Sequence, residues 1–273
     1  MNNPPPIRGQ AHPSAAPRAL AAALPDGRGR PEVIACWSAK GSAGTTVVAA
    51  ALALRLARRS PAGAVLVDGA GDAPAVLGLP EPHDPGLAGW LRSDGDDPLA
   101  EVAACPGLSI VPRGVGPLVA DRAPQLAAAL ASDTRPVVVD CGTAPDGVTA
   151  VMAERADQSL LVTRPCYLAL RRFVSMPLPR PTGVVVIREP GRALSAADVA
   201  ATVGAPIVTE IDVDAAVART VDAGLLAGRL PRSLDTSIAT VLDASRSPER
   251  GARPGDAGVA NDARLEPPEV SAW

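Results

Sequence analysis

Residues 33–54 read VIACWSAKGSAGTTVVAAALAL, which is a short apolar run, a glycine-containing loop and a second run rich in alanine and leucine. The first run is typical of a buried strand and the second of a helix, which we predict over 46–58. Gly41 and Gly44 permit a tight turn whose backbone N–H groups point inward. The positive end of the helix dipole is directed at the same turn. This junction therefore predicts an anion-binding loop.

Short β-branched runs alternate with amphipathic stretches along the rest of the chain. The predicted strands are 33–37, 64–68, 108–112, 136–140, 159–163, 183–187 and 206–210, and the predicted helices are 46–58, 123–131, 169–174, 196–203 and 214–223. Apolar strands separated by helices are typical of a parallel sheet that is covered on both faces. The sequence therefore predicts an α/β fold with a doubly wound, mostly parallel sheet. Ligands of such folds bind beyond the carboxyl ends of the strands.

The composition fits one domain with two tails. The chain has 273 residues, of which 47% are apolar, enough for one sizeable core. Residues 1–30 and 246–273 are rich in Pro, Ala, Gly and Arg without periodicity, so we predict disordered tails around a domain at 31–245. The four cysteines show no CxxC pairing and no 18-residue apolar run exists. A cytoplasmic, non-exported protein is expected.

Lys40 is the only lysine in the chain, and it lies inside the glycine loop. Every other cationic side chain is an arginine. A compact ammonium at this position suits a point-charge contact to phosphate. At the other end of the loop, the hydroxyl of Thr46 stands where a phosphate-binding loop provides a ligand to Mg²⁺.

Two acidic residues end predicted strands. Asp68 closes the strand at 64–68, and Asp140 closes the strand at 136–140. Carboxylates at this edge of the sheet can hold Mg²⁺ directly or through water, and Asp68 can also hold a nucleophilic water. The alternative for each acid alone is a solvated strand end or a helix cap.

The loop resembles the deviant Walker A motif, KGGxGK[ST], of the MinD/ParA ATPases. This resemblance implies that ATP or ADP and Mg²⁺ are the cofactors. It implies catalytic roles for Lys40 and Asp68, nucleotide contacts from Lys40, Gly41, Ser42, Ala43, Gly44, Thr45 and Thr46, and a metal site at Thr46, Asp68 and Asp140. In that family the signature lysine, here Lys40, reaches across a nucleotide-sandwich dimer, so a nucleotide-dependent homodimer is expected.

The sequence departs from the family pattern at four positions. Thr45 replaces the usual P-loop lysine, which resembles the atypical loops of the CpaE/TadZ branch that acts in pilus assembly. Ser42 replaces a glycine. Ala70 replaces the second aspartate that orients water in relatives. The stretch GVVVIRE, 183–189, resembles the strand that usually ends in V-N-R, so Arg188 is expected at the nucleotide, but Ile187 replaces the asparagine that contacts adenine.

These departures bear on hydrolysis more than on binding. Losing the lysine at position 45 removes a charge-assisted contact worth about 1.5–3 kcal/mol. Phosphoryl transfer depends almost wholly on placing charge and water, so it also suffers from the missing carboxylate at position 70. We expect slow or absent ATP hydrolysis. As a hypothesis, Lys40 turns back to its own nucleotide and partly replaces the absent cation.

The resemblance implies a role in spatial positioning, with protein partners in a pilus or secretion apparatus or in the division and partition machinery, at the pole, septum or inner face of the membrane. Two alternatives stay open: a nucleotide-free scaffold, and a DNA-partitioning ParA-type ATPase using Arg171, Arg172 and Arg180 on nonspecific DNA. A Rossmann dinucleotide enzyme would need G-x-G-x-x-G, which is absent. The apolar stripe of Leu234, Ile238, Val241 and Leu242 lacks basic and aromatic anchors, so we expect it to pack on the domain and not to bind membrane.

Overall fold

The computed structural model describes residues 32–81, 85–95 and 99–244, and the tails predicted at 1–30 and 246–273 lie outside this part. The strands are β1 (Val33–Ser38), β2 (Ala64–Asp68), β3 (Val102–Cys105), β4 (Leu108–Val111), β5 (Val137–Thr143), β6 (Gln158–Thr163), β7 (Gly183–Arg188) and β8 (Ile207–Asp212). The helices are α1 (Thr45–Arg59), α2 (Ala73–Leu77), α3 (Gly86–Arg92), α4 (Ala123–Ala131), α5 (Gly147–Arg155), α6 (Tyr167–Ser175), α7 (Ala196–Val203), α8 (Ala215–Asp222) and α9 (Arg232–Ala244). A short 3₁₀ helix, Ala120–Arg122, precedes α4.

The strands form one eight-stranded sheet in the order β3-β4-β2-β5-β1-β6-β7-β8. All neighbouring pairs are parallel except β3 and β4, which are antiparallel. The predicted α/β fold and all seven predicted strands are confirmed. β2 and β4 lie on one side of β1, whereas β6, β7 and β8 lie on the other. The β1–α1 loop therefore lies at the switch point of the sheet, where ligands of such folds bind.

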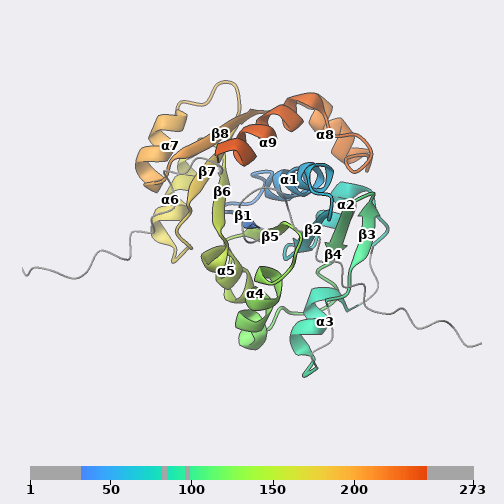
Figure 1. The fold of residues 1–273 in the computed structure, drawn as a ribbon. Helices are drawn as coiled ribbons and strands as arrows, with labels where there is room; N and C mark the ends of the chain where they lie inside the picture. Colours follow the sequence, from blue (N-terminus) through green and yellow to red (C-terminus); the bar gives the residue numbers. More distant parts are fainter. Residues whose placement is uncertain (1–31, 82–84, 96–98, 245–273) are drawn as a thin grey trace, which may run out of the picture. The chain divides into compact units, whose positions relative to one another are not determined.

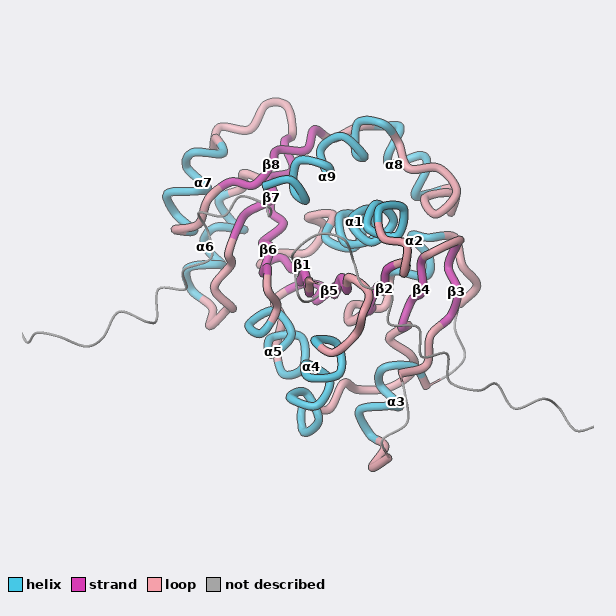
Figure 2. Tube along the Cα trace, in the orientation of Figure 1, coloured by secondary structure: helices cyan, strands magenta, loops and turns pink. Residues whose placement is uncertain are grey.

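Side chains of each central strand alternate between two cores. Ile34 and Cys36 of β1 face a cluster formed with α1, α2 and α9, whereas Ala35 and Trp37 face a second cluster formed with α3 to α7. The two helical layers on opposite faces of the sheet are visible in Figures 1 and 2. Burial on both faces explains why these strands read as continuous apolar runs.

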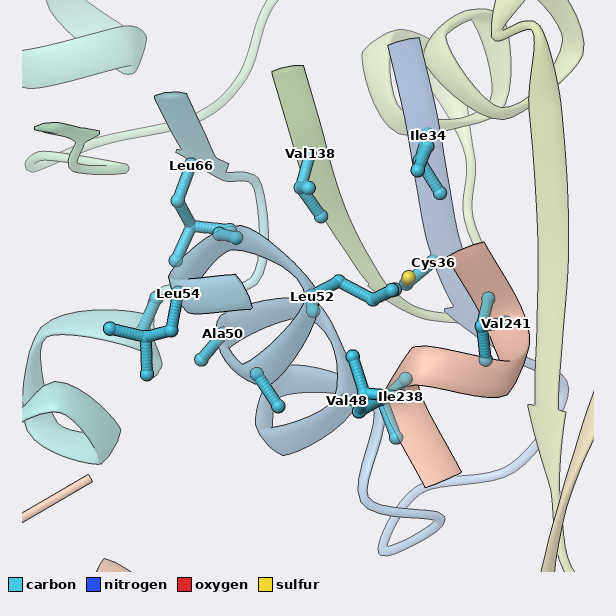
Figure 3. Packing of buried hydrophobic residues seen from close by; sticks show 14 of the residues in the cluster. Ile34, Cys36, Val48, Ala50, Leu52, Leu54, Leu66, Val138, Ile238 and Val241 are labelled. Atoms are coloured by element: carbon cyan, nitrogen blue, oxygen red, sulfur yellow. The ribbon is translucent and has the colours of Figure 1, made fainter. Parts of the chain in front are cut away.

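Helix α1 lies between the sheet and α9. Its residues 48–54 are all buried, and Leu52 packs toward the strands while Val48 meets Ile238 of α9 (Figure 3). The stripe on α9 is fully or almost fully buried: Leu234, Ile238, Val241 and Leu242 are at most 4% exposed. An ion pair between Arg55 and Asp235 also joins the two helices. The prediction that this stripe packs on the domain is confirmed.

The predictions from sequence were incomplete for short elements. They missed β3 and the helices α2, α3 and α5, and for α9 they gave only its apolar stripe. Helix α1 begins at Thr45, one residue before the predicted start. In the part of the chain that is described, no helix is long and apolar enough to cross a membrane.

Two glycines bring α2 and α8 together. Gly78 ends α2 in the left-handed conformation, with φ of 75°, and a Cβ atom there would lie 1.8 Å from the carbonyl oxygen of Gly224. Gly224 itself follows α8 and has φ of 63°. Backbone packs directly on backbone at this point, so glycine is required at position 78 for its lack of a side chain as well as for its φ.

Candidate functional site

A cavity of about 720 Å³ opens at the carboxyl edge of the sheet, beside the N-terminus of α1. Its walls come from the β1–α1 loop and from the segments that follow β2, β4 and β5. The described residues lining it are 42–47, 69, 70, 72, 113, 117, 118, 141–143, 146 and 149. The predicted loop residues Ser42, Ala43, Gly44, Thr45 and Thr46 therefore all face one cavity, which is neither collapsed nor filled by side chains.

The loop backbone is shaped for an anion. Ser42 and Gly44 both have positive φ, of 64° and 88°. Gly44 is the N-cap of α1, no described side chain caps this end, and the first turn holds no acidic residue. The first N–H groups of a helix have no partner within the helix and need one from outside. The open N-terminus of α1 beside a cavity therefore offers unpaired donors and a positive dipole end to a negatively charged ligand.

Asp140 directly precedes residues 141–143 of the cavity wall and has an unsatisfied oxygen. Its side chain is fully buried, and Oδ1 accepts a hydrogen bond from the amide of Gly142 at 3.0 Å, but Oδ2 is buried with no hydrogen-bond partner among the described residues. Burial raises the pKa of this carboxyl, while the nearby hydroxyl of Thr46 and the Gly142 amide act in the opposite direction. A buried carboxylate oxygen without a partner is rare and calls for a cation or a water at that point.

Asp68 has a different environment. It is fully buried, and its oxygens accept hydrogen bonds from the amides of Ala70, Gly71 and Ala73 at 3.1, 2.6 and 3.3 Å. Asp68 and Asp140 are register partners on neighbouring strands. Burial raises the pKa of Asp68 to about 6, and the charge of Asp140 adds to this rise, although the amide of Gly71 lowers it. The side chain therefore caps its own turn, and it does not line the cavity.

The residues present fit a magnesium ion at Thr46 and Asp140. Thr46 lines the cavity, and the unpaired Oδ2 of Asp140 is the orphaned polar atom that such an ion or its water shell would satisfy. The described residues contain no cluster of three or more His, Cys, Asp or Glu that could hold a metal. Magnesium does not need one, because it keeps several waters and takes oxygens from bound phosphates. A metal role for Asp68 stays a prediction.

Lys40 and Arg188 lie outside the cavity wall. Lys40 is partly buried and, together with Arg192, helps to lower the pKa of the Cys166 thiol, for which the amide of Ala169 is the main cause. Its ammonium therefore lies toward β6 and α6. Arg188 is exposed and makes a two-pronged ion pair with Asp212, at 2.6 and 2.9 Å. The predicted nucleotide contacts of Lys40, Gly41 and Arg188 are not made through this cavity as it stands.

Sequence reasoning gave no site role to several polar residues of the cavity wall, among them the following four. Arg113 follows β4, Asp72 precedes α2, and Asp146 and Thr149 form the capping box that begins α5. The only signal for Arg113 was its position directly after the predicted strand 108–112, whereas Asp146 lies six residues beyond the predicted strand 136–140. No recurring spacing marks them.

The sequence matches no family model and no curated protein. Solved structures with similar folds exist. A ParA-family ATPase from Chlorobium tepidum TLS superposes with a TM-score of 0.63 at 23% identity, covering 79% of this chain and 99% of that one. The septum site-determining protein MinD of Pyrococcus horikoshii OT3, solved with Mg-ADP, gives a TM-score of 0.65 at 17% identity, covering 77% and 94%.

The chain has the MinD/ParA fold. A McdA–ATP complex from Cyanothece shares it, with a TM-score of 0.62 at 18% identity over 79% of this chain and 96% of that one. The TM-scores establish the fold, and the identities, all below 25%, leave the chemistry of this chain to its own residues.

The titration of Asp68 gives a first prediction. Its folded pKa, about 6, lies above the ordinary value of 3.8, so the folded state binds the proton more tightly than the unfolded state. Stability from this group is present below about pH 4 and is lost as pH rises to about 6, with a slope of at most about 1.4 kcal/mol per pH unit. Asp140 is shifted in the same direction.

Urea unfolding of wild type and Asp68→Asn without Mg²⁺, from pH 4 to 8, measures this effect. We expect the variant to gain stability relative to wild type between pH 4 and 6 and to keep a constant difference above pH 7. A difference that does not change with pH would contradict the assignment.

Proposed function

We propose that this chain binds ATP with Mg²⁺ in the cavity beside α1, hydrolyses it slowly or not at all, and serves as a nucleotide-dependent positioning protein. The observation that carries the proposal is the uncapped N-terminus of α1 facing a cavity, with the buried Oδ2 of Asp140 left without a partner. The solved structures of MinD with Mg-ADP and of McdA with ATP support it by their fold.

Binding follows from the loop and the strand end. The amides at 42–46 donate to phosphate oxygens, and the helix dipole adds to the attraction. Thr46 and Asp140 would hold the metal, Thr46 by its hydroxyl and Asp140 through water. When bound, Mg²⁺ neutralises charge between the outer phosphates.

Weak hydrolysis follows from what the chain lacks. Thr45 lines the cavity where relatives place a lysine, and Ala70 lines it where they place a second acid. Asp68, the remaining acid of that turn, already accepts three backbone hydrogen bonds. Among the described carboxylates close to the turn after β2, only the exposed Asp72 is free of such backbone hydrogen bonds. Positioning of an attacking water is correspondingly poor.

The biological role we propose is the placement of a protein assembly. The CpaE/TadZ-like threonine at position 45 favours a pilus or secretion apparatus over chromosome partition. The MinC:MinD complex from Aquifex aeolicus, at 21% identity, is a protein of this fold bound to a partner. We propose a nucleotide-dependent homodimer acting in the cytoplasm through protein partners, with direct membrane binding disfavoured because the α9 stripe is buried.

Thermal unfolding with ATP, ADP and AMP, each with and without Mg²⁺, tests the binding. We expect ATP with Mg²⁺ to raise the midpoint most and AMP to have little effect, because AMP cannot span the loop and the metal site. If no nucleotide moves the midpoint, and labelled ATP does not bind at equilibrium, the nucleotide-free scaffold replaces this proposal.

Lys40 provides a second prediction. If its ammonium contacts phosphate, either in its own subunit or in a partner, Lys40→Ala is expected to lower ATP affinity about tenfold and to reduce ATP-dependent dimerisation. Titration with labelled ATP and sedimentation velocity measure the two effects, and Lys40→Arg is the charge-conserving control. Unchanged affinity and unchanged dimerisation would remove Lys40 from the site.

A DNA-partitioning role is the second candidate. Arg171 and Arg172 on α6 and Arg180 beyond it are all exposed, and none makes an ion pair within the described residues. Sequence-independent DNA binding needs several such cations on one face. Retention on nonspecific DNA at low salt, with and without ATP, separates this role from placement through protein partners.

A further inference from the structure

Arg113 is the sole cation among the described residues that line the cavity. The other charged side chains in the wall are Asp72 and Asp146, both acidic and exposed. Lys40 and Arg188 do not contribute to the wall. A cavity that receives several phosphate charges has, in its present form, one side chain that can neutralise them.

The backbone of Arg113 is held from both sides. The first amides of α3 donate to this segment, Leu87 to the carbonyl of Pro112 and Ala88 to the carbonyl of Arg113, both at 2.9 Å. Gly86 and Gly114 pack so closely that a Cβ on Gly86 would lie 2.4 Å from the Pro112 oxygen, and one on Gly114 would lie 2.0 Å from the Pro85 oxygen. The side chain therefore extends into the cavity from a fixed backbone.

Most N–H donors of the Arg113 guanidinium have no partner within the described residues. Its Nη1 donates to the carbonyl of Gly69 at 2.8 Å, and it has no ion pair or further hydrogen bond within the described residues. Other arginines at this edge of the sheet are paired with acids, such as Arg164 and Arg192 with Glu189. Gly71 leaves room for the stem, because a Cβ there would lie 3.2 Å from Cδ of Arg113. Four N–H donors are thus left for a ligand.

The topology gives the direction of a bound phosphate chain. β5 lies next to β1, β2 lies beyond β5, and β4 lies beyond β2. Thr46 and Asp140 would hold the metal of a phosphate chain that rests on the α1 amides, so the outer phosphates of that chain would lie toward β5. The next side chains in that direction are those after β2 and β4, where Arg113 bonds to Gly69.

We infer that Arg113 binds the terminal phosphate of the bound nucleoside triphosphate and supplies the cation that Thr45 does not. This inference rests on the proposed function. Its consequence is selectivity: Arg113 favours the triphosphate over the diphosphate, because only the triphosphate reaches across the end of β2. A guanidinium whose only role was to hold the turn after β2, through its hydrogen bond to Gly69, would favour neither the triphosphate nor the diphosphate.

Equilibrium titration of ATP and ADP, with Mg²⁺, against wild type, Arg113→Gln, Arg113→Lys and Arg58→Gln tests the inference. Glutamine retains an N–H donor for Gly69 but loses the charge, and lysine retains the charge but loses the fork. We expect Arg113→Gln to lower ATP affinity about tenfold and ADP affinity by less than about twofold, with lysine in between. Arg58→Gln, at an exposed arginine in the last turn of α1 and so at the other end of that helix from the cavity, should change neither affinity.

The outcomes distinguish a failure of the proposed function from a failure of the role assigned to Arg113. If wild type binds neither nucleotide, the proposed function fails and this inference with it. If wild type binds ATP but Arg113→Gln loses affinity equally for ATP and ADP, or loses none, the proposed function stands and the terminal-phosphate role of Arg113 is overturned. Urea unfolding of Arg113→Gln without nucleotide shows whether the variant is folded to the same extent as wild type.

Discussion

Replacing Asp140 with asparagine is expected to remove most of the magnesium dependence of ATP binding and, at the same time, to stabilise the ligand-free protein. Oδ2 of Asp140 is buried without a partner, and burial raises the pKa of the group. A neutral amide relieves the cost of that buried charge, which we expect to raise the free energy of unfolding by about 1–3 kcal/mol. Loss of the carboxylate should lower affinity for ATP with Mg²⁺ about a hundredfold.

The test is specific because Asp140→Asn is expected to raise stability and, at the same time, to lower the affinity for ATP with Mg²⁺. Urea unfolding without Mg²⁺ measures stability, and ATP titration with Mg²⁺ or EDTA measures the metal-dependent part of binding. Asp146→Asn is the matched control, because Asp146 is an acid that lines the cavity and asparagine caps α5 equally well. If Asp140→Asn lowers stability while leaving the magnesium dependence intact, the metal site at Thr46 and Asp140 is refuted.

Gly78→Ala is expected to cost about 3–5 kcal/mol of stability, by forcing α2 away from the segment after α8. The new methyl group would lie 1.8 Å from the Gly224 oxygen, and backbone atoms cannot yield as a flexible side chain can. The midpoint and slope of urea unfolding measure the loss.

Gly204→Ala isolates the contribution of the close contact. Gly204 ends α7 with φ of 70° and ψ of 24°, almost the same backbone as Gly78 with 75° and 28°, but no atom lies within 4 Å of a Cβ there. This control should cost only the left-handed strain, about 1–2 kcal/mol. Equal losses for the two variants would show that the α2–α8 contact contributes nothing beyond φ.

The sheet could be predicted because its strands are buried on both faces. A continuous apolar run such as 136–140 predicts a buried strand, because helices cover both faces of the sheet there. β3 was missed for the opposite reason: it is an edge strand of sequence VAAC, and none of its residues is fully buried. The helices α2 and α3 have five and seven residues and contain proline or glycine, so neither shows a helical period.

The site was predictable only where a motif marked it. The loop residues 42–46 were placed in one cavity because glycine spacing and a following helix leave few alternatives. The engagement of Asp68 with three amides of its own turn depends on the dihedral angles of residues 69–73, which composition does not determine. Arg113 follows β4, which is three positions away from β1 in the sheet, and only the folded order of strands brings it to the loop.

Thr45 stands where the resembled motif has its lysine, and it borders the cavity of about 720 Å³ although it is only 7% exposed. A lysine at this position would start at the cavity wall, beside the open N-terminus of α1. Restoring lysine by a single replacement would therefore ask directly whether this scaffold supports turnover.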